Sequence, residues 1–177
     1  MRWLKILIFS PICLLIATVE DISAQVTPSN SATGQIIAEI VPVFSAQETS
    51  QLNFGRFSPG PQGGRIILTP QSTVSLQGSI YKGPGSHNAA SFYVSGDADA
   101  AYSITLPSGP VVLTHISNAK TMVVEDWISV PAAGTGTGML QGGFQVVNVG
   151  ATLKVGTLYD NPVGIYVGSY NISFDFY

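Results

Sequence analysis

The last segment of the chain, Tyr166-Val167-Gly168-Ser169-Tyr170-Asn171-Ile172-Ser173-Phe174-Asp175-Phe176, decides the fold class. Its even positions are mostly aromatic or aliphatic, whereas Ser169, Asn171, Ser173 and Asp175 are polar. Successive side chains of a β-strand point to opposite faces of the sheet, so this alternation predicts a strand with one buried face. We expect the strand to cover residues 164–176, with Ile172, Phe174 and Phe176 in the core.

The preceding sequence, from residue 34 onward, consists of short alternating runs separated by Gly, Pro, Ser and Asn, a pattern typical of a sandwich or barrel. Ile36, Ile37, Ile40 and Val41 could line a helix face, but their β-branched side chains and the following Pro42 favour a strand. We therefore predict an all-β fold, an immunoglobulin-like or pilin-like antiparallel β-sandwich. The expected strands are 34–43, 50–56, 65–68, 73–81, 90–94, 101–106, 111–115, 120–129, 139–149, 152–155 and 164–176.

Two stretches, 58–64 and 131–138, are so rich in Gly and Pro that they are predicted to be loops. The second contains Gly134-Thr135-Gly136-Thr137-Gly138, which resembles a phosphate-binding loop only superficially. Phosphate loops carry a Lys or open a helix, and neither feature is present here. A flexible hairpin loop is the better interpretation.

The first 24 residues are predicted to be a signal peptide. Arg2 and Lys5 provide a positive start, residues 6–19 are apolar, and Ser23-Ala24 are small residues suited to cleavage before Gln25. The apolar run is shorter than the roughly 20 residues that a membrane-spanning helix needs. We expect export to the periplasm, the outer surface or the medium, without a permanent membrane anchor, and a single all-β domain over residues 25–177.

Composition narrows the function classes. The chain has 7 Lys and Arg against 10 Asp and Glu, a net charge of −3, and its basic residues are scattered, which argues against a nucleic-acid partner. The single cysteine, Cys13, lies in the predicted signal peptide, so the exported part has no cysteine for a disulfide, a thiolate metal site or a nucleophile.

The sequence offers no convincing catalytic, cofactor-binding or metal-binding residue. His87 lies in a Gly- and Pro-rich turn and His115 ends a predicted strand, so each is expected to be solvated or to stabilise a loop. Asp97 and Asp99 are close enough to suggest calcium, but the loop lacks the further oxygen ligands that calcium prefers. A polar turn is the simpler interpretation.

Two further candidates lie on the predicted strand 120–129. Glu125 and Asp126 are adjacent, so on a regular strand they would point to opposite faces and could not work as an acid/base pair. Trp127 is the aromatic residue best suited to a test for sugar stacking, because acids that can hydrogen-bond hydroxyl groups precede it. Most aromatic residues of a β-protein, however, serve as core or cross-strand pairs.

Several short motifs, in this order and spacing, resemble an exported bacterial family known only as domain of unknown function 4402. The similarity extends from about Ala32 to Tyr177. The motifs are Leu52-Asn53-Phe54-Gly55, Gly63-Gly64-Arg65-Ile66, Ala90-Ser91-Phe92-Tyr93-Val94-Ser95-Gly96, Tyr102-Ser103-Ile104-Thr105-Leu106-Pro107, Val149-Gly150-Ala151-Thr152-Leu153-Lys154-Val155-Gly156 and the ending from Gly164 to Tyr177.

The resemblance implies a β-sandwich related to pilin-like and spore-coat-like secreted domains, with no known enzyme activity or cofactor. In pilins of the chaperone and usher pathway, the last strand alternates, ends in aromatic residues and is offered to a chaperone. Such pilins usually also have an apolar N-terminal extension and often a disulfide. Here residues 25–31 are polar and include Pro28, so a self-completed sandwich is at least as plausible as an incomplete one.

The leading functional prediction is an exported structural or adhesive protein of the bacterial cell surface, with a subunit of a pilus or fimbria as its specific form. It would assemble with like subunits or other surface proteins through sheet edges. The alternative is a secreted module that binds glycans or another protein through loops such as 83–88 and 131–138. An enzyme is a distant third, because no general acid, base or nucleophile can be assembled.

Overall fold

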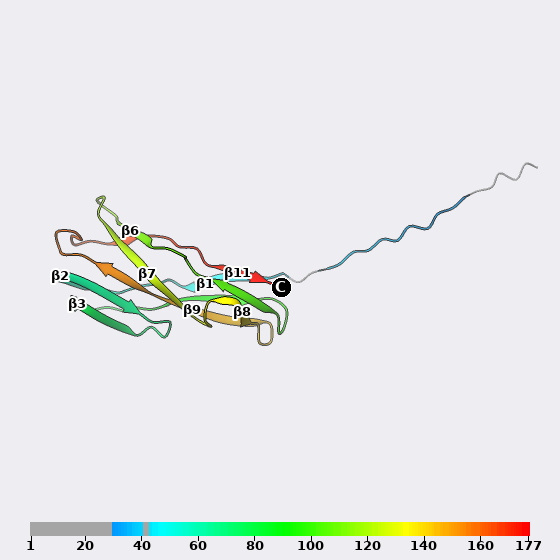
Figure 1. The fold of residues 1–177 in the computed structure, drawn as a ribbon, viewed down its shortest axis with the longest axis horizontal. Helices are drawn as coiled ribbons and strands as arrows, with labels where there is room; N and C mark the ends of the chain where they lie inside the picture. Colours follow the sequence, from blue (N-terminus) through cyan, green and yellow to red (C-terminus); the bar gives the residue numbers. More distant parts are fainter. Residues whose placement is uncertain (1–29, 41–42) are drawn as a thin grey trace, which may run out of the picture. The chain divides into compact units, whose positions relative to one another are not determined.

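A computed structural model describes residues 30–40 and 43–177 (Figure 1). The chain divides into two units, Met1–Glu39 and Ile40–Tyr177. Residues 30–39 of the first unit form no strand and are exposed. The second unit is built from antiparallel strands, and the described residues contain no helix, so the prediction of an all-β, sandwich-like fold is confirmed. The predicted signal peptide lies outside the described residues.

The strands follow one another with short connections. In chain order they are β1 (Ser45–Ser50), β2 (Phe57–Leu68), β3 (Val74–Lys82), β4 (Ala90–Ser95), β5 (Ala101–Thr105), β6 (Val111–His115), β7 (Thr121–Val130), β8 (Gly134–Met139), β9 (Phe144–Val155), β10 (Tyr166–Val167) and β11 (Ser173–Phe176).

The strands form two antiparallel sheets. The larger sheet has the order β1-β4-β9-β7-β6-β10, with β2 joined to β9 and β3 to β2, and the smaller sheet has the order β11-β5-β8. The long β9 pairs along one edge first with β4 and then with β2, and along the other edge with β7. Gly150 lies where β4 gives way to β2, and a Cβ atom there would come within 2.2 Å of the Leu68 carbonyl oxygen. Glycine therefore permits this change of partner.

The buried residues form two clusters that share the central strand β9. The first cluster joins β9 to β2, β3 and β7, and the second lies between β4 and β9 of the larger sheet and β5 of the smaller one. Trp127 and Leu52 pack against both clusters. Burial of this apolar surface supplies the main driving force for folding.

The closing segment shows the predicted alternation, although it is not one continuous strand. Tyr170, Ile172, Phe174 and Phe176 are partly buried, and the polar residues between them are exposed. However, β10 pairs with β6 of the larger sheet, whereas β11 pairs with β5 of the smaller sheet. The segment passes from one sheet to the other, so residues 168–172 between them belong to no strand.

Both predicted Gly- and Pro-rich loops prove to contain strand. Residues 58–64 lie within β2, where an irregularity between Pro59 and Gly64 in the pairing with β3 accommodates the extra residues. Residues 134–138 belong to β8, which pairs with the edge of β5. Gly138 packs under the Tyr102 ring, where a Cβ would lie 2.2 Å from Cζ. Local composition was misleading because close backbone packing, not a turn, requires these glycines.

The predicted N-terminal strands are also corrected. Residues 34–40 and Val43 are not in a strand, and residues 41–42 lie outside the described part of the chain. The first strand of the described residues is β1, which pairs with β4. Of the predicted strand 50–56, Ser50 ends β1, and the remaining residues form only an isolated bridge between Asn53 and Asn88. Residues 144–149 of the predicted strand 139–149 join the predicted strand 152–155 in β9, whereas Met139 ends β8 and residues 140–143 lie between the two strands.

Candidate functional site

The β unit contains an open groove with a volume of about 1310 Å³. We define the groove by its two walls, residues 48–59 and residues 162–170, and by its apolar floor. The floor carries side chains of β6, β7 and β9, namely Val111, Leu113, Met122, Val124, Trp127 and Leu153. The volume exceeds the roughly 300–1,000 Å³ typical of small-molecule pockets. A larger, elongated ligand suits it better.

Both walls belong to segments that have few strand partners. Among the described residues, β1 pairs only with β4, β10 only with β6, and β11 only with β5. Each of these strands therefore keeps one edge without a partner strand. Unpaired N–H and C=O groups at a sheet edge can hydrogen-bond an added strand. The groove thus lies between two segments that each include a strand with one edge free of a partner strand.

Two polar groups in the groove are buried without a hydrogen-bond partner. They are the indole Nε1 of Trp127 and the hydroxyl of Tyr170, whose rings lie 4.7 Å apart between centroids. Burial, reinforced by the nearby Glu48 carboxylate, raises the pKa of Tyr170, so this hydroxyl is protonated at neutral pH. An unpaired buried donor costs about 1–3 kcal/mol.

The wall at 162–166 is held in place by side-chain hydrogen bonds. Asn161 donates from Nδ2 to the Thr121 carbonyl (2.7 Å) and accepts at Oδ1 from the Gly156 amide (2.6 Å). The Tyr166 hydroxyl donates to the Pro162 carbonyl at 2.9 Å. These bonds link the wall to β7 and to the end of β9, so the groove is bounded by an ordered segment.

The two histidines have structural positions. His115 is buried, accepts a hydrogen bond at Nδ1 from the Ser117 amide (3.0 Å), and places Nε2 at 3.1 Å from the Val163 carbonyl. Its ring meets Tyr166 edge to face, so it joins β6 to the groove wall. His87 lies in the turn after β3, partly buried. The structure does not bring the two histidines together into one site.

The interpretation of Glu125 and Asp126 is wrong in one respect. Both carboxylates contact Nη2 of Arg65, Asp126 at 3.1 Å, so they do not point to opposite faces. The register between β7 and β9 shifts between Glu125 and Ile128, and Asp126 has a φ of 52°, which together turn the two side chains to one side. Lys154 also reaches Glu125, at 2.8 Å. Hydrogen bonding by Lys154, supported by Arg65, holds the pKa of Glu125 below its usual range.

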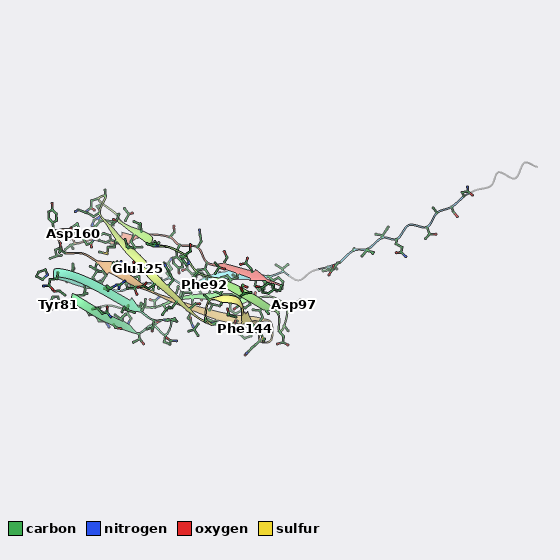
Figure 2. All side chains as sticks on the ribbon, viewed as in Figure 1. Tyr81, Phe92, Asp97, Glu125, Phe144 and Asp160 are labelled. Atoms are coloured by element: carbon green, nitrogen blue, oxygen red, sulfur yellow. The ribbon has the colours of Figure 1, made fainter. Side chains whose placement is uncertain are left out.

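The Asp97 and Asp99 loop forms a turn between β4 and β5. The Ala100 amide bonds the Asp97 carbonyl at 3.3 Å, and the Asp99 amide bonds the Leu140 carbonyl at 2.7 Å. Asp97 lies at the same end of the β unit as Phe144, whereas Tyr81 and Asp160 lie at the other end (Figure 2). Nowhere in residues 30–40 and 43–177 do three or more His, Cys, Asp or Glu side chains gather as a metal ion would require.

Trp127, which the sequence suggested for a ligand test, lies on the groove floor. The acids that precede it instead form the ion pairs with Arg65. Sequence reasoning missed the groove as a whole, because its residues come from separate parts of the chain and share no local motif. The one available signal was the alternation of the closing segment, half of which forms a groove wall.

The geometry defines the class of protein as an antiparallel, sandwich-like β domain with an open groove at its free edges. The family described as Domain of unknown function (DUF4402) matches residues 44–176, and the chain belongs to this family. No curated protein and no solved structure matches the chain. The match begins at Phe44, so residues 32–43 lie outside it. Within the described residues there is no helix long and apolar enough to cross a membrane.

Proposed function

We propose that this protein is an exported structural or adhesive subunit of the bacterial cell surface, of the kind that builds a pilus or fimbria. In this role the groove receives an extended polypeptide segment from another chain, which adds a strand between its two walls. The proposal is non-catalytic. It assigns the groove to assembly rather than to a small substrate.

The open groove is the observation that carries the proposal. Its floor consists of members of the first core cluster and of side chains packed against them, and its walls include parts of β1 and β10, each of which has one edge without a partner strand. An added strand would satisfy edge groups through main-chain hydrogen bonds and fill the floor with alternate side chains. A small ligand would meet only part of these needs.

The sequence supports export and assembly independently of the groove. The first 24 residues have the pattern of a signal peptide, and only 10% of the residues are charged, which suits a surface rich in Ser, Thr, Asn, Gln and Gly. The chain from Gln25 onward has no cysteine, so its stability depends on packing and sheet hydrogen bonds. An additional strand would add both packing contacts and sheet hydrogen bonds.

Antibody labelling of intact cells, followed by extraction of the protein, tests the proposal. The full chain is expressed in a bacterial host with an epitope tag in the exposed turn at residues 117–119, and intact cells are probed with antibody. We expect surface labelling, and extraction of the protein in complexes that dissociate on heating. Leu113→Arg should block the groove floor and so prevent formation of these complexes. Val112→Arg, at the exposed neighbouring position, is the matched control. A protein that stays monomeric inside the cell would contradict the proposal.

A second function, binding of glycans or another protein, is favoured by one exposed aromatic pair. Tyr93 and Phe144 stack with ring centroids 5.7 Å apart and an interplanar angle of 16°, and they are 40% and 51% exposed. They lie on paired strands, β4 and β9, beside the exposed Val146. Titration with soluble polysaccharides tests this function. It would require binding that Tyr93→Ala weakens and that substitutions in the groove leave unchanged.

A further inference from the structure

We infer that the protein binds an uncharged polysaccharide on a flat face of the larger sheet, where sugar rings stack on Tyr93 and Phe144. The inference rests on the second function proposed above and names the ligand class and the surface that binds it. We call this surface the platform. It is the outward face of residues 45–47, 91–95, 128–130 and 144–148, which belong to β1, β4, β7 and β9.

The strand register places the platform on the side of the sheet opposite the core. Tyr93 of β4 pairs with Val146 of β9. Two residues further along β9, Asn148 pairs with Val130 of β7. Val147, between the two β9 residues, is fully buried in the second core cluster. Successive residues of a strand point to opposite faces, so the core occupies one side of this sheet and the platform the other.

An exposed aromatic pair forms the centre of the platform. The rings of Tyr93 and Phe144 are within 16° of parallel, and their centroids are 5.7 Å apart. Both rings therefore present faces of the same orientation. One face of many pyranose rings carries mainly C–H groups, which pack on an aromatic face as other apolar groups do. Val146, Ile128 and Val130, each close to half exposed, extend the apolar surface beside the pair.

Uncharged hydrogen-bonding side chains flank the aromatic pair. Gln47 is exposed on β1, beside β4. The hydroxyl groups of Ser45 and Ser95 lie 3.1 Å apart, and the Ser91 hydroxyl donates to Oδ1 of Asn148 at 2.6 Å. Hydroxyl and amide groups can each make more than one hydrogen bond, so these side chains keep capacity for a ligand. Sugar hydroxyls both donate and accept, which matches this set of groups.

The charge pattern selects an uncharged ligand. The chain has 7 Lys and Arg and 10 Asp and Glu, but none of them occurs in the four ranges that form the platform. Glu48, the next residue along β1, lines the groove instead. An acidic polymer needs basic groups to compensate for the removal of its charges from water, and the platform supplies none. An uncharged polysaccharide meets no such cost.

The shape of the platform favours a polymer over a single sugar. Its four strands and its five residues of β9 span roughly 14 Å in each direction, at about 4.8 Å between strands and 3.4 Å per residue. Tyr93, Phe144 and Val146 do not line the groove, so a ligand here lies on an open surface. Such a surface covers only one side of a sugar ring. Several linked rings add these contacts within one molecule, which raises the overall affinity.

A folded protein partner suits the platform less well. The residues that dominate protein–protein binding are mostly Trp, Tyr and Arg in desolvated pockets. The platform contains one Tyr, neither Trp nor Arg, and presents its aromatic pair on an open face. The polysaccharide is therefore the ligand that the platform fits, and a protein partner is the alternative that the experiment distinguishes.

Affinity electrophoresis tests the inference. The full chain is expressed in a bacterial host, and the purified protein is run in native gels that each contain one polysaccharide. Hydroxyethyl cellulose, mannan and starch serve as uncharged probes, and alginate serves as the acidic probe. We expect at least one uncharged probe, but not alginate, to retard the protein. Because no charged group takes part, the affinity measured by titration calorimetry should be the same at low and high salt.

Substitutions in the aromatic pair show whether the rings themselves bind the ligand. Tyr93→Ala and Phe144→Ala should each weaken binding by about tenfold, because each removes one stacking face. Phe144→Tyr should keep the affinity, whereas Phe144→Leu, which is apolar but has no ring, should lose it. Tyr81→Ala is the matched control, since Tyr81 is exposed and lies at the other end of the β unit from Phe144 (Figure 2).

Circular dichroism and thermal melts identify any variant that is less stable than the wild type. If the alanine variants are destabilised, the comparison of Phe144→Leu with Phe144→Tyr decides the test, because both replacements are large. Absence of retardation by every uncharged probe, tighter binding to alginate, or equal losses for these two variants would overturn the inference.

Two further outcomes separate the platform from the groove. Polysaccharide binding that Leu113→Arg abolishes and Tyr93→Ala leaves unchanged would place the ligand in the groove, and surface complexes that Tyr93→Ala abolishes would show that the platform binds a protein. Either result overturns the inference. If no polysaccharide binds while Leu113→Arg still abolishes the heat-dissociated surface complexes, the proposed assembly function stands without this ligand.

Discussion

Truncation of Phe174 on β11 measures how much the closing segment contributes to stability. The Phe174 ring lies 5.8 Å from that of Phe92 and 6.1 Å from that of Tyr102, and its backbone pairs with Ile104. Because the Phe174 side chain is only partly buried, its truncation to Ala removes roughly half of the 1.5–3 kcal/mol that full burial of a large apolar side chain contributes. The two aromatic contacts add about 0.5–1 kcal/mol each. We expect Phe174→Ala to lower the free energy of unfolding by about 2–3 kcal/mol, below the 3–5 kcal/mol typical of a fully buried Phe.

Urea unfolding of residues 25–177, followed by the emission of Trp127, provides the assay. Ser173→Ala is the matched control, because Ser173 is exposed and its substitution should change stability by no more than about 0.5 kcal/mol. The dependence on urea should keep the same slope for both variants, so the shift in midpoint reports stability. Equal losses for the two variants, or a larger loss for Ser173→Ala, would refute the assignment of faces in the closing segment.

Burial raises the pKa of Tyr102 from 10.0 to about 12. The unfolded chain therefore loses the Tyr102 proton at a lower pH than the folded chain. The stabilisation that this shift provides is fully present below pH 10 and should fall by about 1.4 kcal/mol per pH unit between pH 10 and 12. Urea melts at pH 9 to 11 should show this slope reduced in Tyr102→Phe. Gly138→Ala should destabilise by about 1–3 kcal/mol, since its Cβ would lie 2.2 Å from the Tyr102 ring; an unchanged melting temperature would contradict this. Chelators and calcium should leave the melting temperature unchanged, and a rise with calcium that Asp97→Ala abolishes would reveal a site. The intact mass of the exported protein should correspond to a chain that begins at Gln25.

Strands with clean alternation or β-branched runs could be located from the sequence. The predicted strand 111–115 coincides with β6, that at 73–81 is shifted by one residue from β3, and those at 90–94 and 101–106 differ from β4 and β5 by one residue at one end. In β3, β4 and β6 local preference and burial agree, because each strand buries mainly one face of its own alternating sequence. In β5, by contrast, Tyr102, Ser103 and Ile104 are all buried. The same agreement allowed the polar and apolar faces of the closing segment to be assigned.

Elsewhere, long-range pairing outweighed local composition. Gly134, Gly136 and Gly138 have weak strand preference, but β8 forms because the edge of β5 offers hydrogen-bond partners and the Tyr102 ring needs a residue without a side chain. The isoleucines at 36, 37 and 40 have strong strand preference, but no partner strand pairs with them in the described residues. A strand needs a partner edge, and single-sequence patterns do not identify it.

The candidate site was even harder to predict from the sequence than the strands. Trp127 was proposed for a ligand test because two acids precede it. In the structure these acids contact Arg65 instead, because the irregularity at Asp126 turns their side chains toward Arg65. The groove itself is lined by residues drawn from three separate parts of the chain, within 48–59, 111–127 and 153–170, which only the sheet order brings together. No spacing within one segment encodes such a site.

The sequence by itself determined the all-β class, the family and the two faces of the closing segment, because alternation and short motifs are local properties of the chain. Only the tertiary structure decided that this segment divides between two sheets, that an open groove lies beside it, and that Ile36, Ile37, Ile40 and Val43 are exposed rather than paired. The reason is physical. Hydrogen bonds between strands and burial on a sheet face depend on which distant segments become neighbours, and that choice minimises the free energy of the whole domain rather than of any one segment.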